Sequence, residues 1–180
     1  MSDKPKLYDY QEEGVRMELA MKRCINGDDM GTGKTVQSIV AIERAKATPC
    51  LVVCPAALKV NWEREIKKFT NLRPLILTDS VNATYGYHLT KMNLYDVVIC
   101  NYESLAKYFV VNLGPKPLRL NNFLFRDELK IIKSVIIDES ARVKDPSTRQ
   151  SKIIMGLCQG KDTVLFSKKK VLIKNNKFYF

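Results

Sequence analysis

The sequence predicts an α/β domain in which helices cover both faces of a parallel sheet. Short apolar runs recur along the 180 residues, and stretches with helical periodicity lie between them. The apolar runs are continuous rather than alternating, which is typical of strands that are covered on both faces. With 46% hydrophobic and 27% charged residues, the composition suits one globular domain and excludes collagen-like, low-complexity and disordered chains.

Five runs of aliphatic and β-branched residues predict the strands of the sheet. They lie at residues 50–54, 75–78, 96–100, 134–138 and 163–166. The shorter run at residues 24–26 is a candidate sixth strand.

Helices are predicted where apolar residues recur every three or four positions. They lie at residues 10–23, 34–47, 60–69, 102–111 and 148–155. Gly114 and Pro115 are expected to end the fourth helix, and Gly156 or Gly160 the fifth. Residues 112–126 show neither pattern, so we expect a surface excursion there.

The net charge of +11 favours a polyanionic partner, with nucleic acid first. Five of the lysines lie in residues 168–180, which contain no acid, and subtracting them from +11 leaves +6 on residues 1–167. This tail fits a basic amphipathic strand or helix. It equally fits a sequence that was not selected as part of the domain, such as read-through past a break in the gene.

Membrane and zinc sites are not expected. No apolar run approaches the ~20 residues of a membrane-spanning helix, and the N-terminus lacks a secretory signal. The five cysteines form no C-x-x-C pair, and the chain has one histidine. We therefore expect a soluble intracellular protein with buried, reduced thiols.

The strongest functional signal is the segment Asp28–Thr35, which reads DDMGTGKT directly before an amphipathic helix. Gly31 and Gly33 allow backbone N–H groups to turn into one concavity, and the helix N-terminus adds its dipole. Lys34 is expected to reach the β- and γ-phosphates of a nucleotide, and Thr35 to offer a hydroxyl to Mg²⁺. We call residues 28–35 the phosphate loop.

A second signal follows about a hundred residues later, where the strand at 134–138 ends in Asp138 and Glu139. In a parallel sheet the carboxyl end of this strand opens onto the same edge as the phosphate loop. Asp138 is then placed to orient Mg²⁺, and Glu139 to polarise an attacking water. Together the two motifs predict ATP and Mg²⁺ binding.

These motifs resemble those of the Swi/Snf-type DNA-dependent ATPases of helicase superfamily two. The resemblance rests on DDMGTGKT, on DES followed by ARVKDPSTRQSK, and on the early LYDYQEEGV, and it spans residues 7–165. It implies a RecA-like P-loop NTPase lobe in which Asp28 replaces the general motif's glycine. It also implies that Gln11 reads the adenine edge, and that Asp29, Met30 and Thr32 belong to the nucleotide site.

The resemblance further implies a double-stranded DNA partner. Pro55, Ala57 and Lys59 match a segment that touches the DNA backbone, and Asn101 and Tyr102 match a second one. Two simpler interpretations stay open beside these roles. Trp62 falls on an apolar stripe and favours core packing over base stacking. Asn101 also suits a helix N-cap.

Two departures from the family pattern stand out. Ala141 replaces a common histidine, which puts the coupling of ATP state to the next motif in doubt. After the strand at 163–166 neither a Thr-Gly-Thr-Pro type motif nor a second RecA-like lobe follows. We therefore expect residues 1–167 to form a truncated N-terminal helicase lobe, with 168–180 as an atypical basic tail.

The expected function is the ATP-binding lobe of a double-stranded-DNA translocase with little hydrolysis by itself. The alternative is a non-catalytic basic DNA-binding fragment with a vestigial nucleotide site. A small-metabolite P-loop kinase would need an arginine-rich lid, which the sequence does not clearly offer. The expected location is the cytoplasm of a bacterial or phage-infected cell, or the nucleus if the source is eukaryotic.

Overall fold

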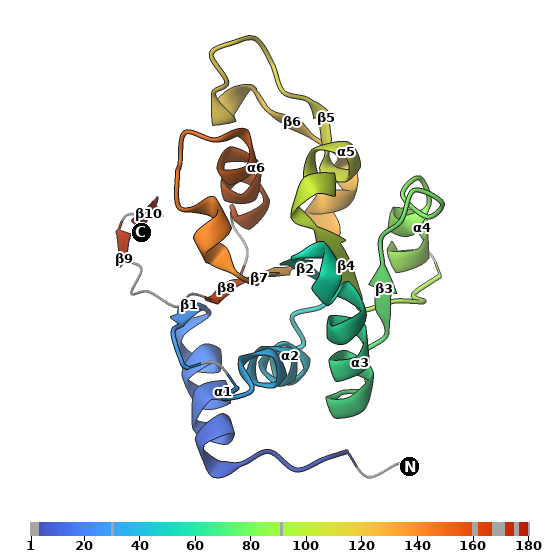
Figure 1. The fold of residues 1–180 in the computed structure, drawn as a ribbon. Coiled ribbons are helices and arrows are strands. Elements are labelled where there is room, and N and C mark those ends of the chain that lie inside the picture. The colour runs from blue at the N-terminus through green and yellow to red at the C-terminus, as the bar shows by residue number, and fades with distance from the viewer. Residues whose placement is uncertain are drawn as a thin grey trace.

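The chain folds around a six-stranded sheet in which all neighbouring strands are parallel (Figure 1). The computed structural model describes residues 4–29, 31–90, 92–159, 162–166, 172–174 and 177–179. Along the sheet the strands follow the order β1-β8-β7-β2-β4-β3. Their bounds are β1 Arg23–Asn26, β2 Cys50–Cys54, β3 Pro74–Ile76, β4 Val97–Asn101, β7 Ser134–Ile137 and β8 Asp162–Phe166. The five predicted strands are confirmed, and β1 is the candidate sixth.

Helices cover both faces of this sheet, as predicted (Figure 1). One face packs against α1 (Asp9–Met21), α2 (Lys34–Ala45) and α3 (Lys59–Phe69), and the other against α4 (Tyr85–Thr90), α5 (Leu105–Phe109) and α6 (Arg149–Cys158). The central strand β2 shows the division directly. Leu51 and Val53 belong to the core with α4, α5 and α6, whereas Val52 and Cys54 belong to the core with α1, α2 and α3. Because side chains alternate along a strand, each core takes every second residue.

The region after β4 differs from the prediction of one helix over residues 102–111. It begins as the 3-10 helix Tyr102–Ser104, continues as the short α5, and then becomes strand β5 (Val110–Asn112). The β-branched Val110 and Val111 favour the extended backbone, and β5 pairs antiparallel with β6 (Leu124–Phe125). The predicted surface excursion at 112–126 thus begins at the last residue of β5 and contains the 3-10 helix Leu120–Asn122 and strand β6.

Other boundaries and short elements were not predicted. Helix α6 runs on to Cys158, so Gly156 lies inside it, while Gly160 lies outside the described residues. Helix α4 has no strong periodic signal in the sequence. Three further 3-10 helices connect the main elements, and they are Ala56–Leu58, Asp127–Ile131 and Ser140–Val143.

The basic tail contains two short strands apart from the main sheet. They are β9 (Leu172–Lys174) and β10 (Lys177–Tyr179), which pair with each other antiparallel. Residues 167–171, 175, 176 and 180 lie outside the described residues. Strand conformation in the tail is compatible with both interpretations, a basic amphipathic element and a sequence not selected as part of the domain.

All five cysteines are buried and free, as predicted. Burial raises the pKa of Cys24, Cys50, Cys54 and Cys100 to about 12, so these thiols stay protonated at neutral pH. Within the described residues, no group of three or more cysteine, histidine or acidic side chains could hold a metal ion. No described helix is both long and apolar enough to cross a membrane.

A substitution at Gly156 tests how tightly α6 packs against residues 112–126. A Cβ at this position would lie 2.3 Å from Cζ of Phe125 and 3.2 Å from Cδ1 of Leu120. Helix propensity alone favours alanine over glycine by about 1 kcal/mol, but overpacking costs about 1–3 kcal/mol. We expect Gly156→Ala to lower the free energy of unfolding measured by urea titration.

Phe125→Leu supplies the matched control, because it removes the ring edge that the new methyl group would meet. The double variant should be less destabilised than the two single changes added together. A Gly156→Ala chain that is more stable than wild type would show that the contact is not tight.

Candidate functional site

Four loop segments meet at one edge of the sheet because all strands run in the same direction. The strands β1, β2, β4 and β7 end at Asn26, Cys54, Asn101 and Ile137. The segments that follow them include the phosphate loop, Pro55–Lys59, Tyr102 and the two adjacent acids. In open α/β sheets this carboxyl edge is where ligands bind. The structure therefore brings the sequence-predicted candidates to one side of the molecule.

The phosphate loop leads from β1 into α2 through two glycines with left-handed backbone. Gly31 has φ +87° and Gly33 has φ +81°, and Gly33 is the N-cap residue of α2. Few non-glycine residues adopt such angles without strain. Lys34 and Thr35 are then the first two residues of α2, at the positive end of its dipole. Met30, which was also predicted to bind nucleotide, lies outside the described residues.

Lys34 folds back onto its own loop. Its Nζ donates to the backbone oxygens of Asp28 and Asp29, the latter at 2.9 Å. The Thr32 hydroxyl also donates to the Asp29 oxygen at 2.9 Å. An ammonium group held at the mouth of a glycine-rich loop fits a nucleotide phosphate, because a charged acceptor makes a stronger hydrogen bond than a neutral carbonyl.

Gln11 is buried against the phosphate loop, with 8% of its surface exposed. Its Nε2 donates to the backbone oxygen of Thr32 at 3.2 Å, and its Oε1 accepts from the Tyr8 backbone N–H at 3.1 Å. A Cβ on Gly33 would lie 2.3 Å from Gln11 Nε2. The side chain thus braces the loop and leaves no room for a residue other than glycine. Its contact with adenine stays a prediction.

A buried polar network that the sequence did not reveal supports the same loop. Asn26 Nδ2 donates to Glu18 Oε1 at 3.1 Å and to Gln37 Oε1 at 2.9 Å. Ser38 Oγ donates to Glu18 Oε1 at 2.9 Å, and the Asp28 backbone N–H donates to Asn26 Oδ1 at 3.2 Å. The network links α1, the end of β1, the loop and α2. The only sequence signal was the placement of Glu18 three residues after Val15, on the inward side of α1.

Glu18 is the ionisable member of this network, with 4% of its surface exposed. Burial raises its pKa from 4.5 to about 7, although the hydrogen bonds from Asn26 and Ser38 act in the opposite direction. Its Oε2 is buried and has no hydrogen-bond partner among the described residues. The carboxyl group therefore favours its neutral form over much of the acidic pH range.

Asp138 and Glu139 lie directly beyond β7. The Asp138 backbone N–H donates to the Val53 oxygen at 2.9 Å, which fixes it against the end of β2. Burial raises the pKa of the Asp138 carboxyl group, while a hydrogen bond from Trp62 and the charge of Lys34 lower it. Glu139 has φ +52°, in the left-handed region that non-glycine residues seldom occupy. Such strain is often found at functional sites.

The donor atoms on this side of the loop suit Mg²⁺. The Thr35 hydroxyl and the Asp138 carboxylate supply the hard oxygen ligands that this ion prefers. The positive charge of Lys34 lowers the pKa of the Asp138 carboxyl group. The residues therefore fit a magnesium nucleotide.

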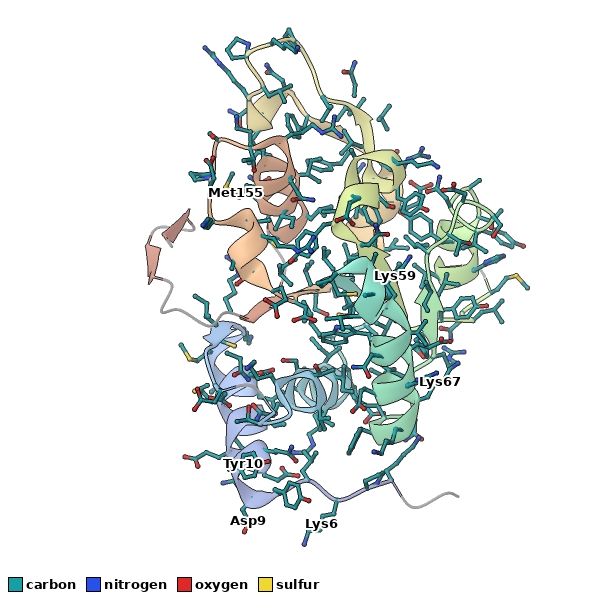
Figure 2. All side chains as sticks on the ribbon, in the orientation of Figure 1. Lys6, Asp9, Tyr10, Lys59, Lys67 and Met155 are labelled. Carbon is teal, nitrogen blue, oxygen red and sulfur yellow. The ribbon has the colours of Figure 1, made fainter. Side chains whose placement is uncertain are left out.

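The second predicted site lies at the ends of β2 and β4. Pro55 precedes the 3-10 helix Ala56–Leu58, Ala57 is exposed, and Lys59 begins α3. Figure 2 shows Lys59 at the end of α3 nearest the sheet. Its Nζ lies 3.5 Å from Asn101 Oδ1, so the two predicted DNA segments touch each other.

Two side chains here behave differently from what the sequence suggested. Tyr102 has 2% of its surface exposed, so its ring does not lie on the surface that would face DNA. The side chain of Asn101 makes no helix cap and instead donates to Glu103 Oε2 at 2.8 Å. Asn101 is the N-cap residue of the 3-10 helix Tyr102–Ser104 by position, but its Oδ1 accepts no backbone N–H of that helix and instead lies 3.5 Å from Lys59 Nζ.

Trp62 packs in the core, as predicted, with 1% of its surface exposed. Its indole N–H additionally donates to Asp138 Oδ2 at 2.9 Å. No sequence pattern predicts this contact, because the apolar stripe of α3 accounts for the position of Trp62 completely. It joins the predicted DNA segment after β2 to the predicted magnesium ligand.

Comparison with known proteins gives consistent matches. The family described as the SNF2-related domain matches residues 10–165. The chain is 32% identical over 166 residues to human chromodomain-helicase-DNA-binding protein 7, covering 84% of this chain and 5% of that protein. It is 30% identical over 156 residues to the DNA annealing helicase and endonuclease ZRANB3 of Bos taurus, covering 86% and 13%.

Among solved structures, the chain is similar to the Sulfolobus solfataricus SWI2/SNF2 ATPase core in complex with double-stranded DNA. The TM-score is 0.68 and the identity 26%, over 93% of this chain and 33% of that one. The chain thus spans a small part of each of these proteins.

The raised pKa of Glu18 can be tested through the pH dependence of the free energy of unfolding. In the unfolded chain the carboxyl group loses its proton near pH 4.5, whereas in the folded chain it keeps the proton to about pH 7. The folded state therefore binds more protons between these values, and stability falls as the pH rises through that window and levels off above it. Glu18→Gln keeps an oxygen acceptor but cannot titrate.

We expect wild type to lose more stability than Glu18→Gln between pH 4.5 and 7.5, by on the order of 3 kcal/mol, because one pKa unit corresponds to about 1.4 kcal/mol. Urea titrations of both chains at a series of pH values measure this difference, since all other groups titrate in both. Parallel stability curves for the two chains would contradict the assignment.

Proposed function

The chain belongs to the SNF2-related domain family, and from this premise we propose that it is the ATP-binding, RecA-like lobe of a double-stranded-DNA-dependent ATPase. The observation that carries the proposal is the meeting of the phosphate loop, Asp138 and the Lys59–Asn101 pair at one edge of a parallel sheet. The family match ends at residue 165. This supports assigning residues 1–167 to the lobe and 168–180 to a separate basic tail.

In this proposal the phosphate loop binds the nucleotide. Lys34 exchanges the carbonyls of Asp28 and Asp29 for phosphate oxygens, and the N-terminus of α2 adds its dipole. Thr35 and Asp138 would hold Mg²⁺, which when bound would neutralise the charge that develops on the phosphates. Glu139 orients the attacking water and accepts its proton. Gln11 supports the phosphate loop through its hydrogen bond to the Thr32 backbone oxygen, and it is proposed to read adenine.

The DNA half of the proposal rests on the second edge site. Lys59 attracts a backbone phosphate, and the exposed turn of Pro55 and Ala57 lets the strand approach closely. Ala57 offers no hydroxyl, so the contact depends on Lys59 and on backbone groups. Tyr102 acts from the interior rather than by direct contact. Such contacts read the backbone and carry no base sequence.

We further propose that ATP turnover needs a second RecA-like lobe. The chain corresponds to 33% of the SWI2/SNF2 ATPase core to which it is similar. Arginine contacts from a partner element contribute roughly 10³–10⁵ in phosphoryl transfer. By themselves, the 180 residues should therefore bind Mg·ATP and hydrolyse it slowly. If the source is eukaryotic, the proposed location is the nucleus.

Titration of the purified 180-residue chain with Mg·ATP tests the nucleotide site. We expect Lys34→Ala to weaken binding by about tenfold or more, since a hydrogen bond to a charged group contributes about 1.5–3 kcal/mol. The matched control is Lys67→Ala, which removes one exposed charge near the far end of α3 (Figure 2) and should bind as wild type does.

Two outcomes would contradict parts of this account. Absence of Mg·ATP binding in wild type would favour a basic DNA-binding fragment with a vestigial nucleotide site. Robust DNA-stimulated ATP hydrolysis by the 180 residues alone, lost in Lys34→Ala, would refute the need for a second lobe.

A further inference from the structure

Two aromatic side chains from different segments hold Asp138 in place. The indole N–H of Trp62 donates to Asp138 Oδ2 at 2.9 Å, and the Tyr102 hydroxyl donates to the Asp138 backbone oxygen. Both aromatic residues are almost completely buried. The carboxylate and the backbone of this residue are therefore fixed by separate hydrogen bonds.

The same two segments carry the polar side chains of the proposed DNA edge. Lys59 lies one helical turn before Trp62 on α3, and Asn101 directly precedes Tyr102. Lys59 Nζ approaches Asn101 Oδ1 at 3.5 Å, which closes the outer side of the arrangement. Each segment thus has one polar residue and one aromatic residue that contacts Asp138, and of the two polar residues Asn101 is buried, with 9% of its surface exposed.

A third connection returns from Asn101 to Tyr102 through charged side chains. Asn101 Nδ2 donates to Glu103 Oε2 at 2.8 Å, and Glu103 Oε1 pairs with Arg142 at 3.1 Å. The Arg142 guanidinium lies over the Tyr102 ring, 5.5 Å from its centroid. The contacts therefore form a closed circuit, which we call the coupling ring. Its members are Lys59, Trp62, Asn101, Tyr102, Glu103, Asp138 and Arg142.

The contacts of the coupling ring differ in strength, and this difference suits the transmission of a change from one ligand site to the other. The Glu103–Arg142 pair is solvent-exposed, and such pairs contribute only about 0–1 kcal/mol. The Trp62–Asp138 bond is partly buried and charge-assisted, so it is stronger. The Glu103–Arg142 pair can therefore rearrange at a low cost in free energy, while the Trp62–Asp138 contact stays ordered.

We propose that the coupling ring makes Trp62 and Tyr102 positioning residues for Asp138, through which duplex DNA at Lys59 and Asn101 alters magnesium-nucleotide binding. A DNA phosphate competes with Asn101 Oδ1 for the Lys59 ammonium. The freed Asn101 side chain changes its contact with Glu103, and Arg142 and the Tyr102 ring follow. Arg142 thus supplies this connection directly after Ala141, the residue that replaces a common histidine of the family. The inference rests on the proposed function for the identity of the two ligands.

The affinity of the 180-residue chain for a fluorescent ADP analogue tests this inference. It is measured with Mg²⁺ and with EDTA, each with and without a short DNA duplex. In wild type the duplex should change the magnesium-dependent affinity by about fivefold, a typical coupling between sites. Affinity in EDTA, which does not involve Asp138, is the internal reference.

Conservative variants identify the route. Trp62→Phe removes the N–H donor and Tyr102→Phe removes the hydroxyl, and both should abolish the effect of the duplex on magnesium-dependent affinity. Glu103→Gln breaks the exposed ion pair without touching the core, and should also reduce the effect. The matched control is Tyr85→Phe, because this buried hydroxyl has no hydrogen-bond partner among the described residues, and it should keep the full effect.

The outcomes separate the inference from the proposed function. Binding of both ligands by wild type without mutual effect would overturn the coupling ring and leave the proposed function intact. Retention of the effect in Trp62→Phe and Tyr102→Phe, or its equal loss in Tyr85→Phe, would also overturn the ring. If wild type bound neither nucleotide nor duplex, the proposed function would fail and the ring with it.

Discussion

The parallel register of the sheet is the constraint on which every part of the site depends. Asp138 reaches Trp62 only because β7 pairs with β2, with Val53 opposite Ile137. Likewise, Asn101 lies beside the start of α3 because β2 pairs with β4, with Cys54 opposite Asn101. A shift of one residue would turn each of these strands over and send its apolar side chains to the other face. The two buried cores therefore fix the geometry of the polar edge.

The polar groups of the edge are ordered by buried partners rather than by surface contacts. Gln11 and the network around Glu18 brace the phosphate loop from within, and Trp62 and Tyr102 brace Asp138. Buried and partly buried hydrogen bonds of this kind specify one arrangement, because breaking one leaves a desolvated group unsatisfied. The exposed pairs, such as Glu103 with Arg142, are weaker and can exchange. Stable hydrogen bonds in the interior, together with exchangeable ion pairs on the surface, suit a site that responds to ligands.

The sequence was sufficient for the strands and the phosphate loop because their signals are local. Continuous apolar runs predict β2, β4 and β7. The spacing of Gly31, Gly33 and Lys34 by itself predicts a phosphate-binding loop. The contacts of Trp62 and Tyr102 with Asp138 span 76 and 36 residues, so no local pattern reports them. Glu18 was missed for a related reason, since a glutamate on an amphipathic helix is usually exposed and only its partners on β1 and α2 explain its burial. The mixed helix and strand after β4 depended on pairing with β6.

The hydrogen bond between Trp62 and Asp138 connects the two proposed binding sites, and the chain has a single tryptophan. Its indole N–H therefore gives one resonance in a ¹⁵N–¹H NMR spectrum. We expect this resonance to lie downfield, to exchange slowly with water, and to move when Mg·ADP binds and again when a DNA duplex is added. An indole proton that exchanges as fast as an exposed one, or that stays in place with either ligand bound, would contradict it.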